Sequence, residues 1–216
     1  MSRLIVFDLD GTLVDSRRDL ADSMNALLLA FGATPLPEQA IGRLVGDGAA
    51  MLVARAFAAA GGDPPEDALD RFLTIYNEHL LDHTRPYPGM REVLDALRPR
   101  AALAVLTNKP LAATRRVLAG VDLAQFFSDD RVIGGDGPFA RKPDPAGLRH
   151  LMAQASAEPD QTTLVGDSAI DWRTARNAAA HACLVRYGFG FEGFPIEQLS
   201  GADSVVETPE GLLQLL

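Results

Sequence analysis

Residues 5–16 read Ile5-Val6-Phe7-Asp8-Leu9-Asp10-Gly11-Thr12-Leu13-Val14-Asp15-Ser16. The apolar run from Leu4 to Phe7 is rich in β-forming residues, which predicts a strand buried on both faces. Asp8 and Asp10 follow this strand at once, and Gly11 then lets the backbone turn. In an open parallel sheet, ligands bind beyond the carboxyl ends of the strands. The two carboxylates are therefore candidate functional groups, the alternative being a solvated turn with two chance acids.

Helical spacing dominates the chain after this stretch. Apolar residues recur at helical intervals from Leu20 to Phe31, and Ser16 with Asp19 three positions later resembles a capping box. The Ala-rich residues 48–60 and the amphipathic run from 65 to 80 predict two further helices. No strand is expected among them, so this block is all-helical.

Strands and helices alternate in the rest of the chain, after an extended connector at residues 85–89. This alternation predicts a parallel sheet with helices on both faces. The strand at residues 4–7 should join that sheet, which makes the helical block an insertion into an α/β, Rossmann-like core. The expected helices are 89–98, 110–119, 145–155, 171–180 and a tail helix, and the expected strands are 101–107, 132–133, 162–166, 182–187 and 203–206.

Composition limits the possible function classes. A net charge of −9 argues against nucleic acid or an anionic membrane as the natural partner. Of the 20 basic residues only Lys109 and Lys142 are Lys, which indicates positions where a compact ammonium is required. The lone Cys183 allows no disulfide framework. Without a signal-peptide pattern or a run near the ~20 apolar residues of a membrane span, we expect a cytoplasmic location.

Four predicted strands end in groups suited to phosphate chemistry. The first ends in Asp8 and Asp10, and the second in Thr107-Asn108, a hydroxyl and an amide that can donate to phosphate oxygens. The third leads through four residues rich in Gly to Arg141-Lys142-Pro143-Asp144-Pro145. The fourth ends in Gly166-Asp167-Ser168-Ala169-Ile170-Asp171. Any one of these is a weak signal, but all four in order at strand ends indicate one shared site.

These motifs resemble the haloacid dehalogenase superfamily of phosphohydrolases, with DLDGT, a hydroxyl residue after the second strand, a Lys before Pro, and GDSxxD. The strings VGDGA, YPGM, TNKP, RKPDP and YGFG resemble its phosphoglycolate phosphatase branch. The resemblance covers essentially the whole chain. It implies a catalytic core of residues 1–15 and 84–216 and an inserted all-helical cap domain of residues 16–83.

The chemistry also follows from the residues themselves. Asp8 would attack phosphorus in line and form an aspartyl-phosphate, while Asp10 would protonate the leaving oxygen and then activate water. Carboxylates around a phosphate require a hard divalent cation with oxygen ligands, and Mg²⁺ suits this role. The family pattern implies that Asp8, the backbone carbonyl of Asp10, and Asp167 hold the metal. It further implies that Lys142 stabilises the phosphoryl charge, that Asp171 orients Lys142 or a metal-bound water, and that Thr107 and Asn108 complete a phosphate cradle.

The cap is expected to select the substrate, which the branch resemblance indicates is 2-phosphoglycolate. We place Arg43, Gly46-Asp47-Gly48 and Arg55 at the mouth of the site. Gly46 and Gly48 would let backbone amides approach a carboxylate closely. Arg43 or Arg55 would form an ion pair with it.

Other functions remain open at this stage. A sugar-phosphate phosphatase or a sugar-phosphate mutase similar to β-phosphoglucomutase would keep both acids and a similar cap. A haloacid dehalogenase would use Asp8 but, by family pattern, lacks an acid at the position of Asp10. The GxGxxG string at residues 188–193 has too little chain after it for a dinucleotide site. Lys109 is expected either to contact substrate or to cap a helix start.

Overall fold

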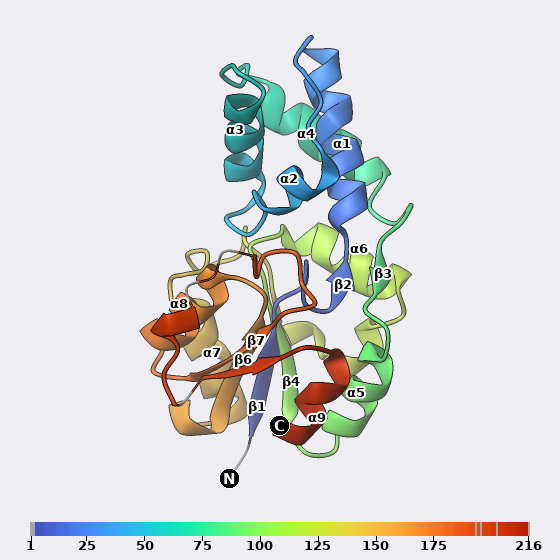
Figure 1. Ribbon diagram of the computed structural model, residues 1–216. Coiled ribbons are helices and arrows are strands. Elements are labelled where there is room, and N and C mark those ends of the chain that lie inside the picture. Colours follow the sequence, from blue (N-terminus) through green and yellow to red (C-terminus); the bar gives the residue numbers. More distant parts are fainter. Residues whose placement is uncertain (1–2, 193, 195, 202, 216) are drawn as a thin grey trace.

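A six-stranded parallel sheet forms the centre of the structure, a computed structural model that describes residues 3–192, 194, 196–201 and 203–215 (Figure 1). The strands lie in the order β5-β4-β1-β6-β7-β8, and every neighbouring pair is parallel. The predicted α/β fold with a Rossmann-like sheet is thereby confirmed. The strands are β1 (Leu4–Phe7), β4 (Ala102–Leu106), β5 (Val132–Ile133), β6 (Thr162–Gly166), β7 (His181–Val185) and β8 (Ser204–Val206).

Helices cover both faces of this sheet, which explains why β1 is apolar throughout. The helices are α5 (Met90–Leu97), α6 (Leu111–Gly120), α7 (Ala146–Ala155), α8 (Ala169–Asn177) and α9 (Leu212–Leu215). Ile5 and Phe7 pack in one core with residues of α5, α6 and α9. Leu4 and Val6 pack in a second core with residues of α7 and α8. Since all four side chains are buried, the strand needs a continuous apolar run rather than alternation.

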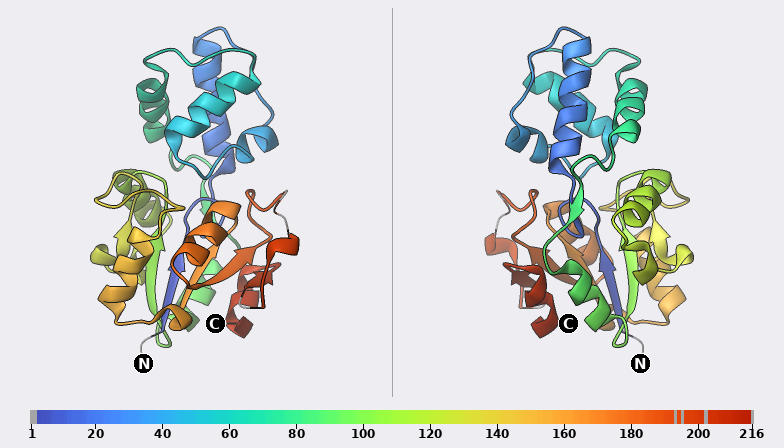
Figure 2. Two further views of the ribbon diagram at one scale, coloured as in Figure 1. Left: turned by 90° about the vertical axis from the view of Figure 1, so that its left-hand side faces the viewer. Right: turned by 90° about the vertical axis from the view of Figure 1, so that its right-hand side faces the viewer.

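Four helices form a separate layer beyond the carboxyl end of β1 (Figures 1 and 2). They are α1 (Arg17–Ala30), α2 (Glu38–Gly42), α3 (Ala49–Ala59) and α4 (Ala68–Glu78), and α1 contacts the other three. We call residues 17–78 the helical block. It contains no strand, as expected, but α2 was not predicted because five residues are little more than one turn. Within the described parts of the chain, no helix has the length and apolar character to cross a membrane.

A short antiparallel ribbon connects the helical block to the sheet. The strand β2 (Val14–Asp15) pairs with β3 (Arg85–Pro86), so that Val14 faces Pro86 and Asp15 faces Arg85. The extended backbone predicted for this connector is present at β3. Its pairing was not predicted, because two-residue strands carry no measurable period. The two segments of chain that connect the helical block to the core therefore lie side by side in this ribbon.

The capping box predicted for Ser16 and Asp19 is wrong. The Ser16 hydroxyl donates to Asp10 Oδ1 at 2.6 Å instead of capping α1. Asp19 accepts hydrogen bonds from the backbone N–H groups of His83 and Thr84, both at 2.8 Å, and from the Thr84 hydroxyl at 2.7 Å. Both side chains are taken by partners outside α1, which spacing along one helix cannot reveal.

Candidate active site

A cavity of about 160 Å³ lies between the carboxyl ends of the strands and the helical block. Its floor carries polar groups from the strand ends, among them Asp8, Asp10 and Asp167. Its roof is mostly apolar and includes Leu52 and Phe72 from the helical block. Residues predicted from the ends of β1, β4 and β6 therefore meet at one cavity, while Lys142 and Asp171 are not among the residues that line it.

Lys142 lies between two buried carboxylates. Its Nζ atom is 2.9 Å from Asp8 Oδ1 and 2.5 Å from Asp171 Oδ1. Asp171 is held in turn by Ser168, whose backbone N–H and hydroxyl donate to Asp171 Oδ2 at 3.1 and 2.6 Å. The helix α8 begins directly after Ser168, two residues earlier than predicted. Of the two roles left open for Asp171, these contacts favour the orientation of Lys142.

Asp167 is enclosed by glycines. Its Oδ2 atom accepts a hydrogen bond from the Gly190 N–H at 2.7 Å. A Cβ atom on Gly11 would lie 2.0 Å from that oxygen, and one on Gly188 would lie 2.3 Å from the Asp167 Cβ. Only glycine fits at these two positions. Gly188 and Gly190 follow β7, so the segment after that strand belongs to the site. The first two glycines of the 188–193 string are explained by packing on Asp167, while Gly193 lies outside the described residues.

Asp8, Asp167 and Asp171 form a buried acidic cluster, with one carboxylate oxygen of each within 4.8 Å of the other two. Burial raises the pKa of Asp8 to about 6, a shift that the Lys142 ammonium opposes and the Asp171 charge increases. Burial, together with the Asp171 and Asp8 charges, raises the pKa of Asp167 well above its usual range. Lys142 alone does not balance three carboxylates. A cation that prefers oxygen ligands therefore fits the charge and the donor atoms of this cluster.

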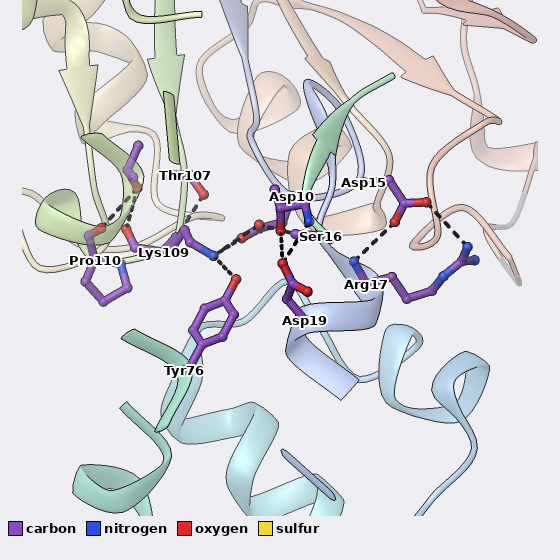
Figure 3. A network of polar contacts seen from close by, with 11 residues as sticks. Asp10, Asp15, Ser16, Arg17, Asp19, Tyr76, Thr107, Lys109 and Pro110 are labelled. Atoms are coloured by element: carbon purple, nitrogen blue, oxygen red, sulfur yellow. Dashed lines mark hydrogen bonds and ion pairs between the residues drawn. The ribbon is translucent and has the colours of Figure 1, made fainter. Parts of the chain in front are cut away.

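Asp10 is held by a network that joins the core to the helical block (Figure 3). The Ser16 hydroxyl donates to Asp10 Oδ1, and Lys109 Nζ donates to both Asp10 oxygens at 3.1 and 3.2 Å. Lys109 also donates to the Tyr76 hydroxyl at 2.5 Å. Its ammonium therefore does not cap the start of α6, one of the two roles considered from the sequence.

Thr107 and Asn108 follow β4 and line the cavity, as expected. The Asn108 side-chain amide donates to the carbonyl oxygens of Gly46 at 2.8 Å and Lys142 at 3.0 Å, so it is not free for a phosphate. Its backbone N–H has no acceptor among the described residues. The Thr107 hydroxyl accepts from the Lys109 N–H at 3.2 Å and keeps its own hydrogen to donate. Of the phosphate cradle predicted from the sequence, the Asn108 backbone N–H and the Thr107 hydroxyl are therefore the groups that can still donate to a phosphate oxygen.

The two glycines predicted at the mouth line the cavity. Gly46 and Gly48 have φ values of 125° and 90°, which favour glycine. A Cβ atom on Gly48 would lie 3.4 Å from the Asn108 carbonyl oxygen. The loop before α3 thus approaches the core backbone closely, and Gly46 accepts the Asn108 hydrogen bond there.

The two arginines predicted at the mouth are engaged elsewhere. Arg43 forms a bidentate pair with Glu192, with nitrogen–oxygen distances of 2.6 and 3.0 Å. Arg55 pairs with Asp47 at 2.6 Å. None of Arg43, Asp47 and Arg55 is among the residues that line the cavity. The structure therefore does not bring these three side chains to the floor residues.

The family follows from comparison with known protein families. Residues 5–185 match the model of the haloacid dehalogenase-like hydrolases. The chain belongs to this family. The resemblance drawn from the four motifs is confirmed, and with it the assignment of this family member as a hydrolase enzyme.

Similar relatives of this haloacid dehalogenase-like protein include phosphoglycolate phosphatases. That of Rhodospirillum rubrum is 43% identical over 201 residues, which cover 89% of this chain and 83% of the relative. That of Caulobacter vibrioides is 38% identical over 223 residues, covering 98% and 91%. The crystal structure of a predicted phosphoglycolate phosphatase from Haemophilus somnus gives a TM-score of 0.90 at 30% identity and covers 99% of this chain and 97% of that chain. The predicted resemblance to that branch of the family is confirmed.

Sequence reasoning missed three contributors to the site of this family member. Ser16 was assigned to a helix cap but holds Asp10. Tyr76 falls within the amphipathic run that predicts a helix over residues 65–80, and its hydroxyl reaches Lys109. Gly190 was known only as part of a family string, although its N–H binds Asp167. The one available signal for the second contact was Lys109 itself, since Lys is so rare in this chain.

Proposed function

We propose that this protein is a phosphatase that hydrolyses a small phosphomonoester, 2-phosphoglycolate, to glycolate and phosphate. The observation that carries the proposal is the position of Asp8, whose carboxylate lies on the cavity floor 2.9 Å from Lys142 Nζ. A nucleophile beside a fixed ammonium suits attack on a dianionic phosphate, because the cation offsets charge repulsion. The similarity to phosphoglycolate phosphatases over most of the chain supports this reaction class.

In the first step, an Asp8 oxygen attacks phosphorus and forms an aspartyl-phosphate, while the bond from phosphorus to the glycolate oxygen breaks. Asp10 gives its proton to that leaving oxygen. In the second step, Asp10 takes a proton from water as the water oxygen attacks the phosphoryl group. The Asp8–phosphate bond then breaks and releases inorganic phosphate. Ser16 and Lys109 orient Asp10 for both transfers.

The acidic cluster fits Mg²⁺ as the cofactor, since hard oxygen donors are the ligands this ion prefers. We propose that Asp8, Asp167 and the backbone carbonyl of Asp10 hold it. When bound, it neutralises the charge that substrate phosphate brings to these carboxylates. Lys142 supplies the remaining positive charge at the phosphoryl oxygens, with Asp171 fixing its orientation.

We further propose that residues 16–83 act as a cap on a core of residues 1–15 and 84–216. Three contacts across this boundary support a closed arrangement: Asn108 with Gly46, Arg43 with Glu192, and Lys109 with Tyr76. Closure over the cavity would exclude bulk water from the aspartyl-phosphate. A cavity of about 160 Å³ supports a small substrate rather than a large one.

The surroundings of the enzyme are also part of the proposal. A net charge of −9 supports a small-molecule substrate rather than a nucleic acid or an anionic membrane surface. The free, buried Cys183 is compatible with a reducing compartment, and we propose a cytoplasmic location.

The test is phosphate release from 2-phosphoglycolate, glucose 6-phosphate, β-glucose 1-phosphate and glycerol 3-phosphate, each with Mg²⁺ and with EDTA. We expect Mg²⁺-dependent release and the highest kcat/KM for 2-phosphoglycolate. A higher kcat/KM for a sugar phosphate would overturn the substrate assignment. Conversion of β-glucose 1-phosphate to glucose 6-phosphate without phosphate release would indicate the mutase instead.

A further inference from the structure

The contact between Lys109 and Tyr76 joins the floor of the cavity to its roof (Figure 3). Lys109 precedes α6 in the core, and Tyr76 lies on α4 in the helical block. The ammonium donates to the Tyr76 hydroxyl at 2.5 Å and lies 4.4 Å from the centre of its ring. Its side chain is 4% exposed, so this cation is held almost entirely out of solvent. Such burial of an ammonium is costly unless anionic or polar groups compensate it.

Lys109 is the one cationic side chain among the described residues that line the cavity. Lys142 lies below the floor and is held by Asp8 and Asp171. Arg43 and Arg55 are engaged by Glu192 and Asp47. A second negative group on a bound phosphomonoester would therefore meet Lys109 rather than an arginine.

The roof gives such a negative group few other partners. Leu52, Phe72 and Leu73 offer only apolar atoms, and a carboxylate beside them would lose hydration without compensation. The polar side chains that the helical block contributes to the lining are Tyr76 and Asn77, and of these the Tyr76 hydroxyl contacts Lys109. Because it accepts from Lys109, its own hydrogen remains to be donated. Burial and the nearby Asp10 and Asp19 charges raise the pKa of Tyr76 well above its usual range, so that hydrogen is retained.

We propose that Lys109 and Tyr76 together bind the carboxylate of the substrate, Lys109 through an ion pair and Tyr76 by donating a hydrogen bond. This assignment rests on the proposed function. In 2-phosphoglycolate a single CH₂ group separates the leaving oxygen from the carboxylate. Asp10, which protonates that oxygen, lies 3.1 Å from Lys109 Nζ. The residue that would protonate the leaving oxygen, Asp10, thus lies next to the residue that would bind the carboxylate, Lys109. This matches the short distance between that oxygen and the carboxylate in glycolate.

The same contact would couple recognition to closure of the cap. A carboxylate bound to both residues bridges the core and α4, so a substrate with that group stabilises the closed arrangement. With a neutral leaving group, Lys109 would stay buried with Asp10 as its only anionic partner among the described residues. Discrimination against neutral phosphomonoesters then follows from the loss of one ion pair and one hydrogen bond.

A positioning role of Lys109 toward Asp10 alone makes a different prediction. If Lys109 only orients Asp10, its removal should slow all alkyl phosphates equally. The experiment therefore compares 2-phosphoglycolate with 2-hydroxyethyl phosphate, which has the same length and an alcohol in place of the carboxylate. The readout is the ratio of the two kcat/KM values in wild type, Lys109→Met and Tyr76→Phe. Arg55→Met is the matched control, because it removes a cation that lies outside the cavity lining and pairs within the helical block.

In wild type we expect a strong preference for 2-phosphoglycolate. Lys109→Met should lower the ratio about a hundredfold, the order expected when one partner of a buried charge pair is removed. Tyr76→Phe keeps the ring and should lower the ratio roughly tenfold. Both variants should also weaken competitive inhibition by glycolate, while the Arg55→Met control keeps the ratio and the inhibition.

Two results would overturn the assignment and are distinguishable. Equal kcat/KM values of the wild-type enzyme for both compounds would overturn both the assignment of 2-phosphoglycolate as the substrate and the assignment of Lys109 and Tyr76 as its carboxylate-binding residues. If the wild-type preference for 2-phosphoglycolate is unchanged in both Lys109→Met and Tyr76→Phe, the carboxylate-binding role of these two residues is overturned, while the proposed function stands. Circular dichroism of each variant establishes that the comparison is made on folded protein.

Discussion

Lys142 Nζ lies 2.9 Å from Asp8 Oδ1, so the buried ammonium touches the proposed nucleophile directly. Burial disfavours the charged form, but the Asp171 and Asp8 carboxylates outweigh it and raise the pKa of Lys142. The ammonium therefore stays charged beside the attacking oxygen. This contact leads to the first prediction.

Lys142→Arg should lower kcat roughly a hundredfold, although the positive charge is kept. A guanidinium is planar and larger, so it cannot occupy the site between Asp8 and Asp171 in the same geometry. Steady-state kinetics on 2-phosphoglycolate checks this result. Activity within about threefold of wild type, less than 1 kcal/mol in the barrier, would show that a point charge at this position is sufficient.

Asp10→Asn should slow alkyl phosphates by about 10²–10⁴-fold and aryl phosphates much less. An alkoxide needs a proton to leave, whereas a phenolate leaves without one. The measurement compares kcat/KM for 2-phosphoglycolate and 4-nitrophenyl phosphate in wild type and variant. Equal losses on both compounds would argue against Asp10 as the general acid.

Asp19→Asn should lower the free energy of unfolding by about 1.5–3 kcal/mol. The buried carboxylate accepts from the N–H groups of His83 and Thr84 and from the Thr84 hydroxyl, where the chain leaves the helical block. An amide in its place would direct an NH₂ group toward donors. Asp22→Asn on the same helix is the control, since that exposed side chain should change stability by no more than about 0.5 kcal/mol. Urea unfolding curves measure both, and equal values would contradict the role of Asp19.

Cys183 should react slowly with thiol reagents in the folded protein at pH 8. Burial raises the pKa of the Cys183 thiol from 9.0 to about 11, against a smaller opposite effect of the Ser204 hydroxyl. The raised value means that the neutral thiol stabilises the fold below pH 9, and that this contribution is lost as pH rises through 11. Reaction with 5,5′-dithiobis(2-nitrobenzoate), with and without urea, checks the prediction. Equal rates in the folded and unfolded protein would refute it.

The sheet was predictable because its strands are continuous apolar runs, as β1 shows. Leu4 and Val6 face one core, and Ile5 and Phe7 face the other. Because all four residues are apolar, the sequence of β1 alone predicts a strand that is buried on both faces. The ribbon of β2 and β3 has no such pattern. Its pairing depends on the path of the chain around the helical block, which local sequence does not encode.

The floor of the site was predictable for a similar reason, since parallel strands place their carboxyl ends at one edge. Contacts across the cavity were not. Arg43 is exposed on the outside with Glu192, a residue 149 positions away. Tyr76 follows the spacing of a core residue, and only the fold brings its hydroxyl to Lys109. Spacing along the chain identifies what an element carries, whereas the pairing of distant side chains requires the packed structure.

The covalent role of Asp8 can be measured directly with ³²P-labelled 2-phosphoglycolate, acid quench within one turnover, and borohydride reduction before digestion with trypsin. Before reduction, we predict acid-stable, protein-bound label in wild type and no label in a folded Asp8→Asn variant. After reduction, we predict homoserine at position 8 in the wild-type peptide of residues 4–17. Release of labelled phosphate by wild type without any labelled protein, or full turnover by Asp8→Asn, would contradict the account.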